Sequence, residues 1–292
     1  LPSGHRVRIP QIALPKTVDG DVVDFHEEFA ADGFSLLPQI SVHIPGGMDS
    51  TGLVLSPDDA ALSVQAEHPT LILNADTGET IAHFVDIRVT GVPSFHLVTL
   101  RPIQPLLSDQ RYIVLVHSAL SPDGDAIAPP VGFAALRDEV SSENQALEIL
   151  REHYAERVFP TIEGAGVSRS NLLIAWDFTT RSKTNLMSDA LAMRATAMAI
   201  FETTPPQVEI ISNDESPQEL VARRIKGTVT APLFLEHSEP GGRMIRDEQG
   251  VPRTETSTKV SFTLQIPHTV VEAGGQAPLL QFGHGFFQSQ GS

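Results

Sequence analysis

Short β-rich segments separated by turn residues constrain the fold of this chain more than any other feature. From Val7 to about Thr180, strand-like runs alternate with turn signals, and long helical periodicities are few. The chain has 292 residues, of which 22 are proline and 21 are glycine. Because these two residues interrupt regular elements and mark turns, the pattern favours an antiparallel sandwich for the N-terminal half or more of the chain.

Several strands can be placed within this region. The clearest hairpin runs from Thr70 to Val85, with turn residues at positions 74–79 between two β-rich arms. A strand over 112–116 is followed by turn residues at 121–125, which predicts a second hairpin. A further strand is predicted over 171–180. Its alternation predicts one apolar face, buried in the core, that carries Leu172, Ile174, Trp176 and Phe178.

Two helices are also indicated. Ser142 and Gln145 fit a capping box, and the helix that follows should pack on the sheet through Leu147, Leu150, Tyr154 and Val158. Residues 184–201 predict a second helix, with one side formed by Leu186, Ala190, Met193, Ala197 and Phe201. Two successive prolines, Pro205 and Pro206, then predict a break, because each disfavours a helical residue before it.

Three strands are predicted after the break, over 226–235, 259–266 and 279–282, and a long polar loop joins the first two. The third runs into Gly283-His284-Gly285. A strand that enters a glycine turn is how an α/β-hydrolase builds its oxyanion loop, because glycines let backbone N–H groups approach a developing negative charge. The alternative is a glycine-rich strand exit with an incidental histidine.

The sequence lacks the serine motif that such an enzyme needs. An α/β-hydrolase nucleophile lies in Gly-x-Ser-x-Gly, and the two closest matches, at Gly33/Ser35 and Gly166/Ser168, lack the second glycine. We therefore expect the nucleophile outside these 292 residues, and the chain alone to be inactive. The acid and the base of the triad cannot be assigned either.

Three segments carry a family resemblance: 69–84, 100–112 and the run Ala175-Trp176-Asp177-Phe178-Thr179-Thr180. Together they resemble large secreted or envelope-associated bacterial proteins that join an Ig-like N-terminal region to an α/β-hydrolase domain of lipase or esterase type. The resemblance implies an extracellular or cell-envelope location, a carboxylic ester substrate, either a small molecule or a lipid, and no cofactor. It also implies that His284 and Gly285 form the oxyanion loop and that the Phe286 backbone N–H faces the oxyanion.

The expected organisation has three parts. An Ig-like, β-rich domain spans 1–182, a helical connection spans 183–205, and the first strands of an α/β-hydrolase sheet span 206–292. The competing hypothesis is a non-catalytic β-rich adhesion or interaction module in which the last segment is one more strand. The sequence does not indicate the oligomeric state.

Composition narrows the possible partners. Lys+Arg number 20 and Asp+Glu 36, and the net charge of −16 opposes binding to nucleic acid and to anionic lipid. The tight basic cluster at 223–226 is interpreted as a solvated strand edge, and no apolar stretch predicts a transmembrane span.

Cysteine is absent, which rules out disulfides and thiolate metal sites. His26-Glu27-Glu28 lacks the second histidine of a zincin helix, and Asp19-Gly20-Asp21 and Asp123-Gly124-Asp125 lack most ligands of a calcium loop, so no metal site is predicted.

Overall fold

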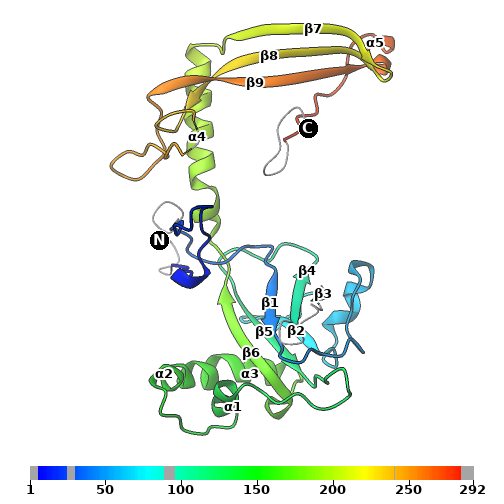
Figure 1. Ribbon diagram of the computed structural model, residues 1–292, viewed down its shortest axis with the longest axis vertical. Coiled ribbons are helices and arrows are strands. Elements are labelled where there is room, and N and C mark those ends of the chain that lie inside the picture. Colours follow the sequence, from blue (N-terminus) through cyan, green and yellow to red (C-terminus); the bar gives the residue numbers. More distant parts are fainter. Residues whose placement is uncertain (1–5, 25–29, 89–95, 240, 284–292) are drawn as a thin grey trace. The chain divides into compact units, whose positions relative to one another are not determined.

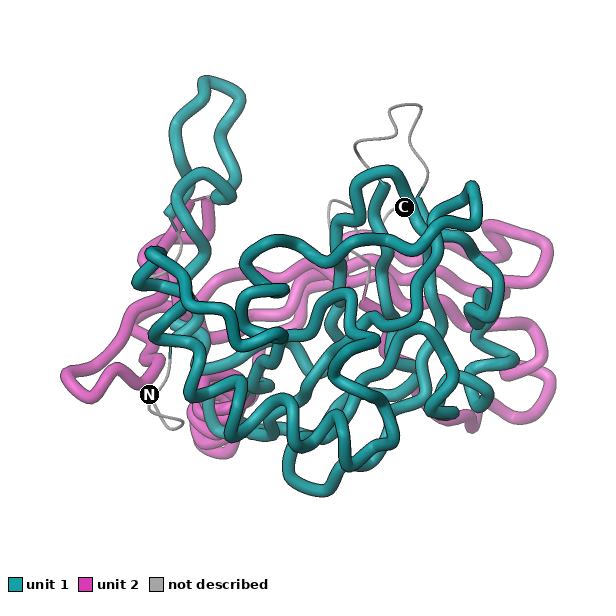
Figure 2. The backbone as a smooth tube through the Cα atoms, turned by 90° about the horizontal axis from the view of Figure 1, so that it is seen from below, with its two compact units in different colours: residues 1–186 teal, residues 187–292 magenta. Residues whose placement is uncertain are grey.

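The computed structural model describes residues 6–24, 30–88, 96–239 and 241–283. The chain divides into two compact units, residues 1–186 and 187–292 (Figure 2). Within the described residues, nine strands form three antiparallel sheets of three strands each. The protein is therefore β-rich, in agreement with the sequence pattern.

Unit 1 contains two of the sheets (Figure 1). One has the order β1-β4-β3, with strands β1 (Ile40–His43), β4 (Leu97–Pro102) and β3 (His83–Arg88). The other has the order β2-β5-β6, with strands β2 (Thr70–Asn74), β5 (Arg111–His117) and β6 (Leu172–Thr179). Both sheets contribute to one apolar cluster, in which Val85, Val98 and Leu100 from the first meet Ile72, Val114 and Val116 from the second. The two sheets thus pack face to face, as in a sandwich.

Helices cover the outer face of the second sheet. They are α1 (Val131–Arg137), α2 (Gln145–His153), a π-helical turn η4 (Tyr154–Val158) and α3 (Phe159–Gly164). A second apolar cluster joins Phe133, Phe159 and Ile162 from these helices to Leu71 and Leu115 of the sheet. Because β2 and β5 are covered on both faces, nearly all their residues are buried, and they read as continuous apolar runs.

The first predicted hairpin is divided between the two sheets. The turn forms as expected, with the Gly78 N–H donating to Asn74 O and Ile81 N–H to Ile72 O. Beyond Ile81 the chain leaves β2, and β3 pairs with β4 in the opposite sheet. The prediction of one continuous hairpin over 70–85 was wrong, because burying both apolar arms required one in each layer. The predicted turn at 121–125 also forms, but it closes only a bridge between Leu120 and Ala126.

The predicted helices form with two differences. Asn144, not Ser142, caps α2 by accepting the Ala146 N–H, while the Ser142 N–H donates to Glu148. The helix then widens into the π-turn η4 before Pro160, which has no N–H to donate to the carbonyl four residues earlier. The described part of unit 1 also contains the 3₁₀ helices η1 (Gln11–Ala13), η2 (Pro57–Val64) and η5 (Arg169–Asn171).

Strand β6 agrees with the predicted strand over 171–180, but its faces differ from the prediction. The register of β5 and β6 shifts between Val116 and His117, so Leu172 packs in the helix-side cluster. Trp176 and Phe178 pack against the cluster between the sheets and are only partly buried. The prediction of one buried face containing all four apolar residues was therefore wrong for Leu172, and for Trp176 it overstated the burial.

Unit 2 consists of most of helix α4 (Lys183–Thr203), three long strands and a short helix. The strands, in the order β7-β8-β9, are β7 (Val208–Gln218), β8 (Val221–Leu233) and β9 (Thr256–Pro267), and α5 (His268–Glu272) follows. Helix α4 ends at Thr203, and only Thr204 separates it from Pro205 and Pro206, which agrees with the break predicted at these prolines. The units, however, divide between Leu186 and Met187. None of the residues of α4 is buried, so its predicted apolar side has no full cover in the described structure.

The sheet of unit 2 differs from the predicted strands at both ends. Strand β7 was not predicted, because its sequence mixes apolar residues with Glu209, Asp214 and Glu215. The predicted strand over 279–282 does not form; these residues lie outside any helix or strand and are exposed. Gly227, in the middle of β8, is required by packing, since a Cβ there would lie 2.5 Å from Glu209 O and 2.8 Å from the Phe262 ring.

Candidate functional site

The residues predicted to form the oxyanion loop, His284, Gly285 and Phe286, lie outside the described residues. The preceding segment is described as far as Gly283, and Leu279, Leu280 and Phe282 there are each more than 80% exposed. The assignment of these three residues remains a prediction.

The two serines that come closest to a nucleophile motif have ordinary structural partners. The Ser35 hydroxyl accepts the Leu37 N–H in a local turn. The Ser168 hydroxyl lies 2.9 Å from that of Ser170. Both serines are exposed, and neither has a histidine partner among the described residues. Neither therefore has the base that would activate a hydroxyl.

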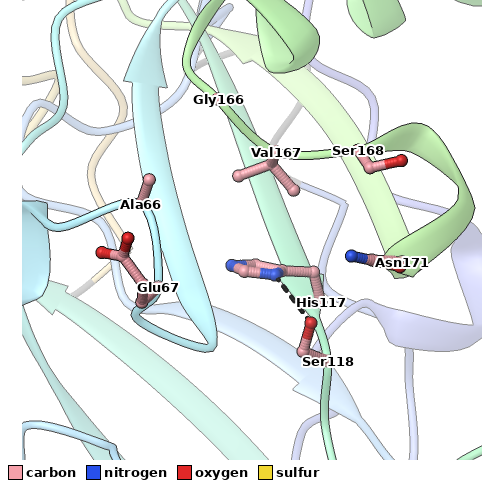
Figure 3. A pocket seen from close by; sticks show the side chains of 8 residues that line it. All are labelled: Ala66, Glu67, His117, Ser118, Gly166, Val167, Ser168 and Asn171. Carbon is pink, nitrogen blue, oxygen red and sulfur yellow. Dashed lines mark hydrogen bonds between the residues drawn. The ribbon is translucent and has the colours of Figure 1, made fainter.

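A polar cavity of about 280 Å³ lies at the end of strand β5 in unit 1 (Figure 3). Residues from three segments line it: Ala66, Glu67, His117, Ser118, Gly166, Val167, Ser168 and Asn171. The segments are the turn before β2, the end of β5, and the loop that leads through η5 into β6. This cavity holds a hydrogen-bonded pair of serine and histidine side chains.

The pair consists of adjacent residues, His117 and Ser118. The Ser118 hydroxyl lies 3.2 Å from His117 Nδ1, as the dashed line in Figure 3 marks. His117 Nε2 lies 2.8 Å from the His68 carbonyl oxygen, which can only accept, so Nε2 carries the proton and Nδ1 accepts from Ser118. Ser118 has φ of 50°, a left-handed conformation that is uncommon for a residue other than glycine.

His117 belongs to a group of three buried imidazoles, with His68 and His83. His68 Nδ1 donates to Thr70 O at 2.6 Å, and its Nε2 accepts the Val54 N–H at 3.1 Å. His83 Nδ1 donates to Ile81 O at 3.0 Å, and its Nε2 accepts the Thr70 hydroxyl at 2.9 Å. Each ring thus uses one nitrogen as donor and the other as acceptor, which is the pattern of a neutral imidazole. The network links the segment before β3 to β2 and to the end of β5.

Burial lowers the pKa of all three histidines. Desolvation is the largest cause for each, and it lowers the pKa of His83 to about 4. For His117 the backbone carbonyl of His68 and the charge of Glu67 oppose this shift without reversing it. A base with a lowered pKa takes a proton from serine less readily, and a carbonyl stabilises an imidazolium less than the carboxylate of a triad does. The hydrogen bond between His117 and Ser118 is therefore better suited to stabilising the local fold than to activating the Ser118 hydroxyl.

A second polar group joins residues from two of the segments singled out in the sequence, 100–112 and 175–180. Arg111 in β5 donates to Asp177 in β6 at 2.9 Å, and His153 at the end of α2 contacts the same carboxylate at 2.9 Å. Arg111 also donates to Arg157 O in the π-turn. These contacts fasten the helical layer to the sheet. The sequence offered no sign of this triangle, because its members are separated by 24 to 66 positions.

The candidate metal segments form turns or lie outside the described residues. Gly20 and Gly124 have φ of 91° and 87°, and the Gly124 N–H donates to Ser121 O, as in an ordinary turn. Residues 25–29, which include His26 and Glu27, are outside the described structure. Within the described ranges, no three His, Asp or Glu side chains gather in a way that could hold a metal ion. Over the same ranges, no helix combines the length and the apolar character that a bilayer crossing requires.

Comparison with known proteins adds no family assignment. No protein-family model matches the chain, and no curated protein matches it either.

Proposed function

We propose that the chain is the N-terminal part of a bacterial serine hydrolase that acts on carboxylic esters, of lipase or esterase type, and that these residues lack the nucleophile. In this proposal unit 1 is an accessory β-rich domain, unit 2 begins the α/β-hydrolase sheet, and sequence after Ser292 supplies the nucleophile, acid and base. The complete protein would act outside the cytoplasm or in the cell envelope and would need no cofactor.

The observation that carries the proposal is the order of elements in unit 2. Two long antiparallel strands, β8 and β9, are joined by a wide loop, and in the sequence the apolar segment 279–282 and Gly283-His284-Gly285 follow. An α/β-hydrolase likewise places a glycine turn after its early strands, where the backbone N–H groups bind the oxyanion. The segment 279–282 lies outside the sheet here, so its pairing in the complete enzyme is part of the proposal.

The side chains of the unit 2 sheet give further support. Alternation over the three strands places apolar residues on one face, among them Val208, Ile210, Ile225, Val229, Val260, Phe262, Leu264 and Ile266. The opposite face carries polar residues such as Thr228, Lys226 and Ser261. None of these apolar side chains is buried. A sheet with one apolar face is stable in water only when another layer covers it, and helices provide that layer in α/β proteins.

The proposed mechanism is acyl transfer. A serine attacks the ester carbonyl, histidine takes the serine proton, and the Phe286 backbone N–H stabilises the oxyanion of the tetrahedral intermediate. An oxyanion donor stabilises charge only after a nucleophile has attacked. The 292 residues alone are therefore expected to hydrolyse no ester.

The test begins with the gene. The reading frame after Ser292 is expected to encode Gly-x-Ser-x-Gly, followed by an acidic residue and then a histidine. The product of the whole reading frame should hydrolyse p-nitrophenyl butyrate and react with a fluorophosphonate, whereas residues 1–292 should do neither. Ester turnover by residues 1–292 would contradict the proposal. A reading frame without the motif would favour the non-catalytic adhesion module.

The oxyanion assignment has a matched pair of variants. Phe286→Pro removes the backbone N–H and should lower kcat of the whole enzyme by about 10²-fold or more. Phe286→Ala keeps the N–H and should retain most of the activity. Equal activity of the two folded variants would place the oxyanion donor elsewhere.

A further inference from the structure

Strand β3 lies at one edge of the sheet β1-β4-β3, and its backbone groups alternate between two directions. Those of His83, Val85 and Ile87 point away from β4. The His83 N–H donates to the Ser63 hydroxyl, and the Val85 N–H donates to Val54 O at 2.7 Å. Residues 54–64, which end in the helix η2, therefore cover the edge at His83 and Val85. Such cover is how sheet proteins prevent an edge from pairing with other chains.

Ile87 is the next outward position, and no described segment covers it with a hydrogen bond. Its N–H and C=O have no hydrogen-bond partner in the structure of the described residues. Ile87 lines a cavity of about 480 Å³ beside the edge of β3. Eight residues line the cavity: Met48, Asp49, Ser50, Leu55, Val85, Asp86, Ile87 and Pro122. The edge is thus open at one outward residue, where a cavity adjoins it.

The lining combines an apolar floor with carboxylates. Met48 and Val85 are buried members of the core between the sheets, while Leu55 is 53% exposed. Hydrogen bonds from Thr51 lower the pKa of Asp49, so its carboxylate is ionised at neutral pH. Asp86 also lines the cavity, and its carboxylate pairs with Arg101 at 2.7 Å. The net charge of −16 also favours a basic partner over an acidic one.

We propose that this groove binds a short extended segment of another protein by β-augmentation. The bound segment adds one strand to β3, donates to Ile87 O and accepts from the Ile87 N–H. Its alternate side chains are apolar and basic. The apolar ones contact Met48 and Leu55, and a basic one meets Asp49.

A second copy of this chain is a poorer occupant. Antiparallel pairing of β3 with another β3 would bring Asp86 of one copy towards Asp49 and Asp86 of the other. Like charges that face each other across paired strands are destabilising. Self-association is therefore an outcome that the test must distinguish.

The probe is the pentapeptide acetyl-Val-Lys-Val-Lys-Val-amide, titrated into residues 1–292 by calorimetry and followed by the amide resonance of Ile87. We expect saturable binding, with the Ile87 amide shifted. Acetyl-Val-Glu-Val-Glu-Val-amide should bind at least about tenfold more weakly, which corresponds to about 1.4 kcal/mol. Size-exclusion chromatography with light scattering should show a monomer at the same concentrations.

Two variants and one modified peptide locate the site. Ile87→Pro removes an outward N–H that the ladder to β4 does not use, so the fold should persist and binding should weaken by about tenfold. Asp49→Asn should weaken binding of the lysine peptide and strengthen binding of the glutamate peptide, because it removes an attraction from the first and a repulsion from the second. A peptide N-methylated at the residue that donates to Ile87 should lose binding, whereas N-methylation of the next residue, whose N–H points outward, should not.

The modified peptides keep the test decisive if Ile87→Pro does not fold. Absence of saturable binding at millimolar lysine peptide would overturn the proposal. Equal binding of the two N-methylated peptides would overturn it as well, as would a dimer that forms through β3.

Discussion

The two sheets of unit 1 and the sheet of unit 2 share the same alternation of side chains, yet they differ in burial. In unit 1, Leu71, Ile72 and Leu115 are 0% exposed because a layer lies on each side of their sheet. In unit 2, Val208 is 59% exposed and Ile210 is 54% exposed. Alternation assigns a side chain to a face, but only a second layer removes that face from water.

The difference shows what holds each part together. Full burial of a leucine or isoleucine side chain stabilises a fold by about 1.5–3 kcal/mol, so unit 1 gains most from its two apolar clusters. The sheet of unit 2 depends more on its long hydrogen-bonded ladder between β8 and β9, which runs from Val221 opposite Pro267 to Leu233 opposite Thr256. Such a ladder fixes register, but each backbone bond adds little net stability.

The largest effect is expected when a leucine is shortened to alanine in each of the two units. Leu115→Ala, between the helices and the sheet of unit 1, should lower the free energy of unfolding by about 2–5 kcal/mol. Leu264→Ala in β9 should cost less than about 1.5 kcal/mol, because its side chain is only partly buried. Urea unfolding followed by Trp176 fluorescence reports unit 1, and hydrogen exchange in β8 and β9 reports unit 2. Equal costs would show that the unit 2 face is covered in solution.

Acidification should destabilise unit 1 through its buried histidines. The pKa of His83 falls to about 4 in the folded state, from about 6.5 in the unfolded chain. The stabilisation that neutral His83 gives the folded state is fully present above pH 6.5 and is lost as the pH falls towards 4. The free energy of unfolding should fall by about 1.4 kcal/mol per pH unit, and by up to about 3 kcal/mol in all. Burial shifts the pKa values of His68 and His117 in the same direction.

The measurement is the urea midpoint of unit 1 between pH 8 and pH 4. His83→Gln keeps a donor and an acceptor but cannot take up the proton, so its midpoint should be lower at pH 8 and vary less with pH. The opening free energy of β8 and β9 in unit 2, obtained from hydrogen exchange after correction for the intrinsic exchange rate, should change less over this range, because unit 2 has no buried histidine among its described residues. A midpoint for the parent that is constant from pH 7 to pH 4.5 would contradict the neutral-imidazole network.

The smallest effect compares two ion pairs. The side chains of Arg111 and Asp177 are 16% and 17% exposed, whereas those of Lys259 and Glu209 are 64% and 63% exposed. Asp177→Asn should lower the free energy of unfolding by about 1–3 kcal/mol, because it leaves Arg111 with a weaker partner and weakens the contact with His153. Glu209→Gln should leave the free energy of unfolding within error of that of the parent, since solvent and salt screen an exposed ion pair. A larger loss for Glu209→Gln would mean that β7 depends on this contact.

The sequence by itself determined most element types and one boundary. Short β-rich runs bounded by turn residues identified the strands around Ile72 and Val114, and alternation identified the strand around Ile174, because a side chain on a strand changes face at each residue. The prolines at 205 and 206 marked the end of α4, because proline restricts the residue before it. Local chemistry of this kind does not depend on what the segment later contacts.

Only the tertiary structure decided which strands pair and which side chains become buried. It divided the expected hairpin over 70–85 between two sheets, moved Leu172 to the helix side, and gathered His68, His83 and His117 from distant positions. It also left the segment 279–282 outside the sheet. The physical reason is that pairing and burial depend on non-local contacts, whereas sequence periodicity records only the spacing of neighbours along one segment.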